Sequence, residues 1–309
     1  MDKLETSVIC INKFRSLTKA AKELGVTQPA LSAGLNSVEK KLGFCIFDRK
    51  KTPIELTAEG EVYLEYLKAK DVLEHNLYGR IRDLRQERDQ TIVIGAPATY
   101  VETVLVGAVD EFLKQYPEYH IRILESTIPE LLDKTTHGDV NLFISTSNTL
   151  PEGFETECLA SEKIYLCVPI NNPINDSLNN LRTGLGEETD SFPFELLTGE
   201  KFITLAPNQP LQMETDRYCE AHDLIFHSCI EVDQVTTAVR LARHGLGICF
   251  SSEGVLKNLP DIGGLRVYPV PRDMFQRKIY VAYSKENYLS AGCKKLIEIL
   301  KKETGGEKL

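Results

Sequence analysis

The chain has 309 residues, of which 42% are apolar and 26% charged, which suits two or three folded domains and argues against wholesale disorder. No segment approaches the roughly 18–20 consecutive apolar residues of a membrane helix, and no signal-peptide core is present, so a cytoplasmic protein without membrane contact is expected. Residues 1–57, the head of the chain, hold 10 Lys and Arg against 6 Asp and Glu, whereas residues 89–309 hold 20 against 32. Of these two segments, only the head has the net positive charge that suits binding to nucleic acid.

Two helices joined by a tight turn are predicted near the N-terminus. Apolar residues recur at helical spacing over residues 17–24, with Ser16 as the N-cap, and a second apolar stripe runs over residues 31–42. Glycines at positions 25 and 43 suit the left-handed residue that ends a helix. The short connection between the two helices has the length of a helix-turn-helix.

The start of the second helix carries the features of a DNA-reading segment. Thr27 can accept a hydrogen bond from the free amides of the first turn, and Pro29 lacks an amide that would have no partner there. Together with Gln28, this helix N-terminus is suited to a phosphate and the major groove. The alternative is an ordinary helical hairpin that is capped by Thr27.

A short hairpin is predicted directly after this helix. The stretch FDRKKTPIELT at residues 47–57 begins with Arg49, Lys50 and Lys51 and continues with alternating apolar residues. Long basic side chains at such a wing can reach backbone phosphates or the minor groove. The alternative is a solvated charged face.

Residues 4–60 resemble the N-terminal pattern of the LysR-type transcriptional regulators. The matching positions are Leu4, Ser16, Ala20, Ala21, Leu24, Gln28, Pro29, Ala30, Leu31, Ser32, Glu39, Leu42, Gly43, Phe47, Arg49, Leu56, Thr57 and Gly60. The remainder resembles the family in layout and length. The resemblance implies an α/β protein with an N-terminal all-α winged helix-turn-helix, a long linker helix and a two-lobed α/β effector domain like a periplasmic binding protein.

The resemblance also implies the residues that contact DNA. Carried over position by position, they are Thr27, Gln28, Pro29, Ser32, Arg49 and Lys50, to which the local pattern adds Asn36 and Lys51. Ala33 and Gly34 replace the usual long polar pair, so bidentate reading of bases is not available there. Either Gln28, Ser32 and Asn36 read the operator together with DNA shape, or Gly34 allows close approach to the backbone.

A long helix is predicted over residues 57–90. Apolar residues at helical spacing form a seam along it, namely Leu73, Leu77, Ile81 and Leu84. The family resemblance favours a homodimer or homotetramer paired through this helix, with two heads on a roughly palindromic operator. The alternative is that the seam packs on the chain's own body.

Strands alternate with helices from residue 91 onward, which predicts parallel sheets with crossover helices. The expected organisation is residues 1–57 for the winged head, 58–89 for the linker helix and 90–309 for the effector domain. Within the last, lobe I takes about 90–162 and 270–309, and lobe II takes about 163–269. Crossing segments near 161–164 and 267–272 would then leave a cleft at the carboxyl ends of the strands.

Residues at the predicted strand ends, most of them polar, are the candidates for effector contacts. They are Pro97, Ala98, Thr99, Ser126, Thr127, Ser145, Asn208 and Asp233. Hydroxyls beside helix N-terminal amides suit a carboxylate or another small anion, and family effectors commonly contact the positions that match Thr99, Ser126, Thr127 and Ser145. The alternative role for each of these Ser and Thr residues is to cap a helix and not to contact a ligand. The polar stretch at 175–192 is longer than the usual connection and is expected as a mobile surface loop near the cleft mouth.

Three rival classes are weighed against an effector-controlled regulator. A peroxide-sensing regulator would use Cys219 and Cys229, but Pro210 stands where the resemblance would place the reactive cysteine. An enzyme is not expected, because no P-loop, GxSxG, HExxH or dinucleotide-binding glycine pattern is present. A solute-binding protein would leave the basic head unexplained.

The expected function is therefore control of transcription at promoter DNA. The expected partners are the double-stranded operator, a small effector and RNA polymerase, whose access would change as the effector alters occupancy or DNA bending. No cofactor is expected. The eight cysteines form no CxxC pair and no Cys/His cluster at zinc-ligand spacing, so no metal is expected either.

Overall fold

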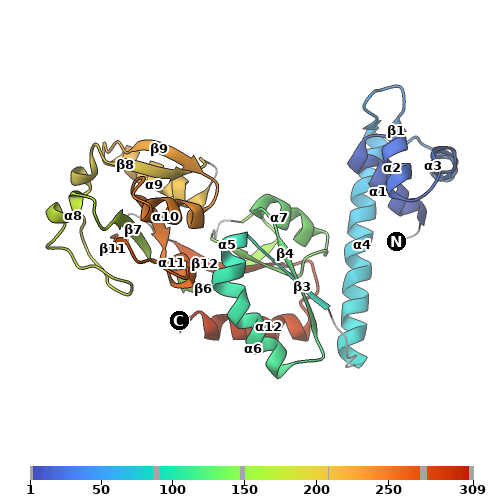
Figure 1. The fold of residues 1–309 in the computed structure, drawn as a ribbon. Helices are drawn as coiled ribbons and strands as arrows, with labels where there is room; N and C mark the ends of the chain where they lie inside the picture. The colour runs from blue at the N-terminus through green and yellow to red at the C-terminus, as the bar shows by residue number, and fades with distance from the viewer. Residues whose placement is uncertain (1–2, 86–90, 147–149, 208, 272–276, 306–309) are drawn as a thin grey trace. The chain divides into compact units, whose positions relative to one another are not determined.

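The computed structural model describes residues 3–85, 91–146, 150–207, 209–271 and 277–305. Contacts divide the chain into two units (Figure 1). The first contains residues 1–86 with 136–139 and 286–288, and the second contains the remaining residues. Among the described residues, no helix is long and apolar enough to cross a lipid bilayer.

Three helices form the head of the first unit, and their bounds are α1 Lys3–Phe14, α2 Leu17–Glu23 and α3 Gln28–Leu42. The predicted caps are confirmed: the Ser16 hydroxyl accepts a hydrogen bond from the Lys19 amide at 3.4 Å, and Gly43 ends α3 at φ 82°. The apolar faces of these helices meet in one core, in which Ile11 and Leu35 are almost fully buried. The helix-turn-helix prediction therefore holds.

A hairpin and a long helix complete the first unit. Strands β1 Phe47–Asp48 and β2 Glu55–Leu56 pair antiparallel, as the wing prediction requires. Helix α4 runs over Ala58–Arg85, and its start is capped where the Thr57 hydroxyl accepts a hydrogen bond from the Gly60 amide at 2.9 Å. A Cβ at Gly60 would lie 2.0 Å from the Ile46 carbonyl oxygen, so this close packing of wing on helix needs glycine.

A five-stranded sheet organises the first lobe of the second unit, in the order β4-β3-β5-β12-β6. Its strands are β3 Thr91–Ala96, β4 His120–Glu125, β5 Leu142–Ser145, β6 Phe154–Ser161 and β12 Lys278–Ser284. Its helices are α5 Ala98–Tyr100, η1 Val101–Leu105, α6 Val106–Gln115, α7 Ile128–Thr136 and α12 Ala291–Glu303. Helices α6 and α12 supply apolar side chains to the same core as β3 and β5.

The second lobe contains two small sheets. One has the order β10-β7-β11, with β7 Ile164–Pro169, β10 Cys249–Ser252 and β11 Leu265–Pro269, and the other pairs β8 Lys201–Leu205 with β9 His227–Val232. The helices are α8 Ile174–Ser177, η2 Phe194–Leu197, α9 Pro210–Ala221, α10 Val235–Arg243 and α11 Glu253–Asn258. All five strands contribute to one apolar core.

The prediction of parallel sheets is only partly right. Strand β3 is parallel to β4 and β5, and β8 is parallel to β9. Strand β12 is antiparallel to β5 and β6, and β7 is antiparallel to β10 and β11. The amino end of β12 therefore lies beside the carboxyl end of β5, and this brings residues near 277 to the predicted edge.

Candidate functional site

The amino end of α3 is open to solvent. Thr27 is its N-cap and accepts a hydrogen bond from the Ala30 amide at 3.4 Å. Gln28 and Pro29 are exposed in the first turn, and the helix dipole adds a partial positive charge there. The terminus can therefore meet a phosphate or base edge without rearrangement of the head.

One face of α3 packs inward and the other faces solvent. Leu31 and Leu35 are buried in the head's core, whereas Gln28, Ser32 and Asn36 lie four residues apart on one face. Of this stripe, Ser32 is half-buried and the other two side chains are exposed. The polar residues predicted to read DNA thus lie together on the accessible side.

The wing is held against α3 by a buried carboxylate. Glu39 is only 9% exposed, and its Oε1 accepts hydrogen bonds from the amides of Ile46 at 2.8 Å and Phe47 at 3.3 Å. Its Oε2 accepts a charge-assisted bond from Arg49 at 2.5 Å. Arg49 therefore fixes the wing as well as being a predicted DNA contact, a structural role that sequence reasoning missed.

The two wing lysines have different surroundings. Lys51 pairs with Glu55 at 2.5 Å on the exposed hairpin. The Lys50 amide donates to Asp48 at 3.0 Å, and its side chain is exposed without an ion pair to any residue that the structure describes. Lys50 is therefore the wing cation most available to a phosphate.

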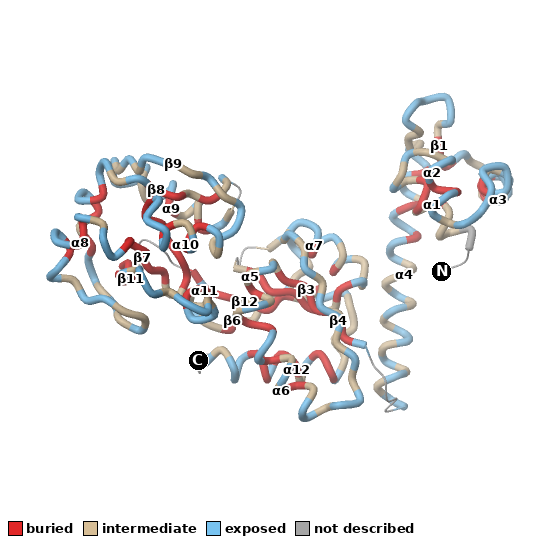
Figure 2. The backbone as a smooth tube through the Cα atoms, viewed as in Figure 1, coloured by how far each residue is buried: buried red, intermediate tan, exposed pale blue. Residues whose placement is uncertain are grey.

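The predicted seam of α4 is exposed to solvent. Leu73 is 68% and Leu84 85% exposed, Leu77 is exposed as well, and Ile81 is half-buried. Figure 2 shows that the buried positions of α4 lie in its first half, toward the head. Apolar side chains at this spacing without cover suit pairing with a second helix.

The predicted hydroxyls at the ends of β3 and β4 are largely engaged in capping. The Ser126 amide donates to the Ala96 carbonyl at 3.2 Å, and its hydroxyl bonds to the Glu130 carboxylate. The Thr127 carbonyl accepts the first helical hydrogen bond of α7, and hydrogen bonds from Ser126 and Thr127 lower the pKa of Glu130. These contacts form a capping arrangement at the start of α7.

The other predicted effector residues differ in accessibility. Pro97 precedes α5, Ala98 is exposed, and Thr99 is half-buried with its carbonyl bonded to Thr103. Ser145 is 1% exposed at the end of β5, and Asp233 is exposed after β9. Asn208 lies outside the described residues.

A cavity of about 820 Å³ lies between the two lobes, at the β5–β12–β6 half of the sheet edge. Thr146, Ser161 and Tyr280 line it from the first lobe, and Tyr165, Glu188 and Val270 line it from the second. The hydroxyl residues predicted to contact the effector lie at the β4–β3–β5 half of this edge. They adjoin the cavity lining only where Thr146 follows Ser145. The cavity residues flank the predicted crossing segments, a signal that could have identified them.

A buried charged group lies at the wall of this cavity. Arg277 is 7% exposed, its Nε lies 2.9 Å from Glu162 Oε2, and it donates a hydrogen bond to the Tyr100 hydroxyl at 2.7 Å. Burial and the Glu162 carboxylate raise the pKa of Tyr100, so this hydroxyl remains neutral. The three side chains join the first crossing segment and the residue that precedes β12 to α5.

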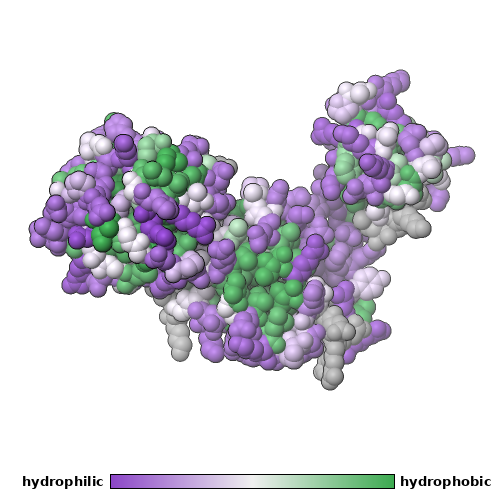
Figure 3. Space-filling view, viewed as in Figure 1, coloured by the Kyte–Doolittle hydropathy of each residue, from purple (hydrophilic) through white to green (hydrophobic). Residues whose placement is uncertain are grey.

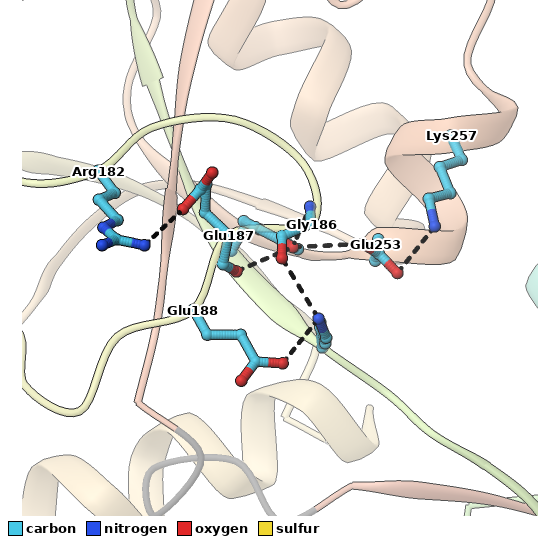
Figure 4. A network of polar contacts seen from close by, with 8 residues as sticks. Arg182, Gly186, Glu187, Glu188, Glu253 and Lys257 are labelled. Carbon is cyan, nitrogen blue, oxygen red and sulfur yellow. Dashed lines mark hydrogen bonds and ion pairs between the residues drawn. The ribbon is translucent and has the colours of Figure 1, made fainter. Parts of the chain in front are cut away.

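A loop of the second lobe forms another wall, and polar contacts tie it to β7 (Figure 4). The Gly186 amide donates to the Tyr165 hydroxyl at 2.9 Å, and Lys163 pairs with Glu188 at 2.7 Å. Burial raises the pKa of Tyr165 to about 12. The loop lies within the predicted 175–192 stretch, whose first residues belong to α8.

The chain belongs to the LysR family of transcriptional regulators. Residues 6–61 match the bacterial regulatory helix-turn-helix protein, lysR family, and residues 85–305 match the LysR substrate binding domain. It is therefore a DNA-binding transcriptional regulator with a substrate-binding effector domain, as the sequence resemblance predicts.

Individual relatives match this chain over most of its length, and two solved structures share its fold. The HTH-type transcriptional regulator YybE of Bacillus subtilis is 26% identical over 285 residues, which cover 90% of each protein. Full-length CbnR in complex with its target DNA has a TM-score of 0.64 at 18% identity and covers 98% of this chain and 99% of that one. Full-length OxyR of Pseudomonas aeruginosa has a TM-score of 0.66 at 19% identity, covering 98% and 97%.

Proposed function

We propose that residues 1–57 bind an operator in double-stranded DNA through the amino end of α3 and the wing. The supporting observations are the exposed first turn of α3, where Gln28 lies at the positive end of the helix dipole, and the exposed Lys50 on the wing. Thr27, Pro29, Ser32 and Asn36 complete the contact surface. Arg49 and Lys51 contribute positive charge from their paired positions.

A small effector bound between the lobes of residues 90–309 controls this DNA binding. The cavity supports the proposal because both lobes line it, so a ligand there contacts the two lobes at once. Such a ligand has different affinities for open and closed lobes, which is the requirement for shifting between them. The closed form then alters promoter occupancy or DNA bending and thereby the access of RNA polymerase.

A thermal-shift screen of small carboxylates and amino acids on the full chain tests the effector proposal. Each compound that stabilises the protein is then included in DNA footprinting. We expect at least one compound to raise the melting temperature and to change the footprint. Stabilising compounds that all leave the footprint unchanged would contradict control by the effector.

We further propose that residues 58–89 hold a homodimer together and that a second apolar surface allows a homotetramer. The α4 seam is the first surface. Figure 3 shows apolar side chains gathered over α5 and α6 on the first lobe, where Val106 is 58% exposed. Exposed apolar areas of this kind mark association sites.

Replacing Leu77 and Leu84 together with Asp is expected to convert the assembly to smaller species. Four buried carboxylates would enter each paired seam, and each is strongly unfavourable without a partner. Sedimentation velocity of the full chain measures the change. The control is Arg82→Asp, which lies on the opposite side of α4; equal sedimentation of the double variant and wild type would contradict pairing through the seam.

Peroxide sensing is not favoured by the surroundings of Cys219. Burial, together with the Asp216 carboxylate, raises the pKa of this thiol to about 11, so about one molecule in ten thousand carries the reactive thiolate at pH 7. We expect alkylation of Cys219 at pH 8 to be at least about 100-fold slower in the folded chain than in urea, where the pKa returns to about 8.5. Mass spectrometry measures the alkylation rate of Cys219. Equal rates in the folded chain and in urea would support the redox alternative.

A further inference from the structure

The two walls of the interlobe cavity carry opposite chemistry. The first lobe presents the hydroxyls of Thr146, Ser161 and Tyr280 together with the ammonium group of Lys278. The second lobe presents a run of acidic side chains on the loop that follows Gly186, namely Glu187, Glu188 and Asp190. Hydroxyls and an ammonium suit a carboxylate, whereas carboxylates suit an ammonium.

Several charges at the cavity are already neutralised by neighbours. Arg277 is paired with Glu162 at 2.9 Å, and Lys163 with Glu188 at 2.7 Å. Lys278 makes no ion pair with any residue that the structure describes, and the same holds, within those residues, for Asp190. The charges left over are therefore positive on the first lobe and negative on the second.

The remaining acidic residue, Glu187, has only a weak partner. Its carboxylate lies 3.3 Å from Arg182, whose side chain is 77% exposed. Ion pairs this exposed contribute little, because water and salt screen them. Glu187 can therefore turn to a ligand cation at small cost.

The acidic loop is fixed in place before any ligand arrives. The Tyr165 side chain is fully buried, its hydroxyl accepts the Gly186 amide at 2.9 Å, and it donates to Glu253 at 3.3 Å. The Lys163 ammonium also donates to the Gly186 carbonyl at 3.4 Å. A wall held in this way costs less to order on binding than a free loop.

We propose that this cavity binds a small zwitterion of the amino-acid class. Its carboxylate lies against Lys278 and the hydroxyl of Ser161 on the first lobe, and its ammonium lies against Asp190 and Glu187 on the second. The inference rests on the proposed effector function, because it names the chemical class of the ligand at the same cavity. A volume of 820 Å³ is in the range of small-molecule sites.

The division of charge between the lobes gives this ligand its specificity. A ligand with only a carboxylate would leave the acidic wall without a counter-charge. A ligand with only an amine would leave the Lys278 ammonium without one. A zwitterion satisfies both walls only when they approach each other, so it favours the closed lobes.

Calorimetry on the full-length chain with matched probes tests the proposal. The zwitterions are glycine, β-alanine, γ-aminobutyrate and δ-aminovalerate with the common α-amino acids, and the comparisons are carboxylates and amines of the same chain lengths. We expect at least one zwitterion to bind at least about tenfold tighter than both of its singly charged counterparts. A carboxylate or an amine that binds as tightly, or no zwitterion that binds, would overturn the proposal.

Two variants locate the site. Lys278→Met and Asp190→Asn are each expected to weaken the best zwitterion at least about tenfold, because each removes one charge-assisted contact. Asp176→Asn, an exposed change in the same lobe as Asp190 but outside the cavity lining, is expected to leave binding unchanged. Unchanged binding in both cavity variants would overturn the proposal.

DNA affinity separates this inference from the function on which it rests. If another chemical class binds and alters DNA affinity, the effector function stands and the zwitterion class is wrong. If a zwitterion binds through Lys278 and Asp190 while DNA affinity stays constant, the site stands and effector control is wrong.

Discussion

Changing Gln28 to Glu is expected to weaken operator binding by at least about 30-fold. The substitution preserves the size and shape of the side chain but places a carboxylate at the amino end of α3, where the phosphates and base edges would lie. A lost contact of about 1–3 kcal/mol in each of two heads gives about 2–6 kcal/mol for a dimer. Fluorescence anisotropy at one fixed salt concentration measures the affinity.

The Gln28 variant separates binding from folding. A carboxylate in the first turn interacts favourably with the helix dipole, so the head is expected to be no less stable than wild type. The matched control is Gln115→Glu at the end of α6, which makes the same chemical change and adds the same charge elsewhere. Equal affinities for the Gln28 and Gln115 variants would show that the amino end of α3 does not face DNA.

Changing Glu39 to Ala is expected to release the wing from α3. The carboxylate accepts the amides of Ile46 and Phe47 as well as the guanidinium of Arg49, and the two amides belong to buried residues. Unsatisfied buried donors cost about 1–3 kcal/mol each, so the local free energy of opening is expected to fall by about 2–5 kcal/mol. Hydrogen exchange over residues 44–57 is expected to accelerate at least about 30-fold.

The wing itself supplies the control for this change. Glu55→Ala removes an exposed carboxylate that pairs with Lys51, and its effect is expected to stay within about 1 kcal/mol. Glu39→Gln, which keeps one acceptor oxygen, is expected to fall between the two. Equal exchange in the Glu39 and Glu55 alanine variants would contradict an anchoring role for the buried carboxylate.

Local signals predicted the head well because its structure is decided locally. The Ser16 and Thr27 caps, the glycines at 25 and 43 and the apolar spacing of α2 and α3 act within a few residues, and each is found as predicted. The role of Glu39 escaped the same reasoning. A buried carboxylate and a solvent-exposed one look alike in sequence until the wing that covers the residue is folded.

The effector domain was predicted less completely because its pairing is long-range. Strand β6 lies at the sheet edge, with Leu159 buried and its other residues half-buried or exposed in no regular alternation. It pairs with β12, which follows more than a hundred residues later. The reversed direction of β12 brings Arg277 and Lys278 to the edge where β5 ends. Sequence reasoning placed the candidate site at the carboxyl ends of the strands and did not include these two residues.

Footprinting of the full-length chain on DNA upstream of its own gene, at low salt, tests the central claim most directly: that the amino end of α3 seats in a groove of the duplex. We expect two protected half-sites separated by about one helical turn, or about 10 base pairs, with protection lost in Gln28→Glu and retained in Gln115→Glu. No protection by the wild type at low salt, or protection that survives the Gln28 change, would contradict the assignment of the DNA-binding surface.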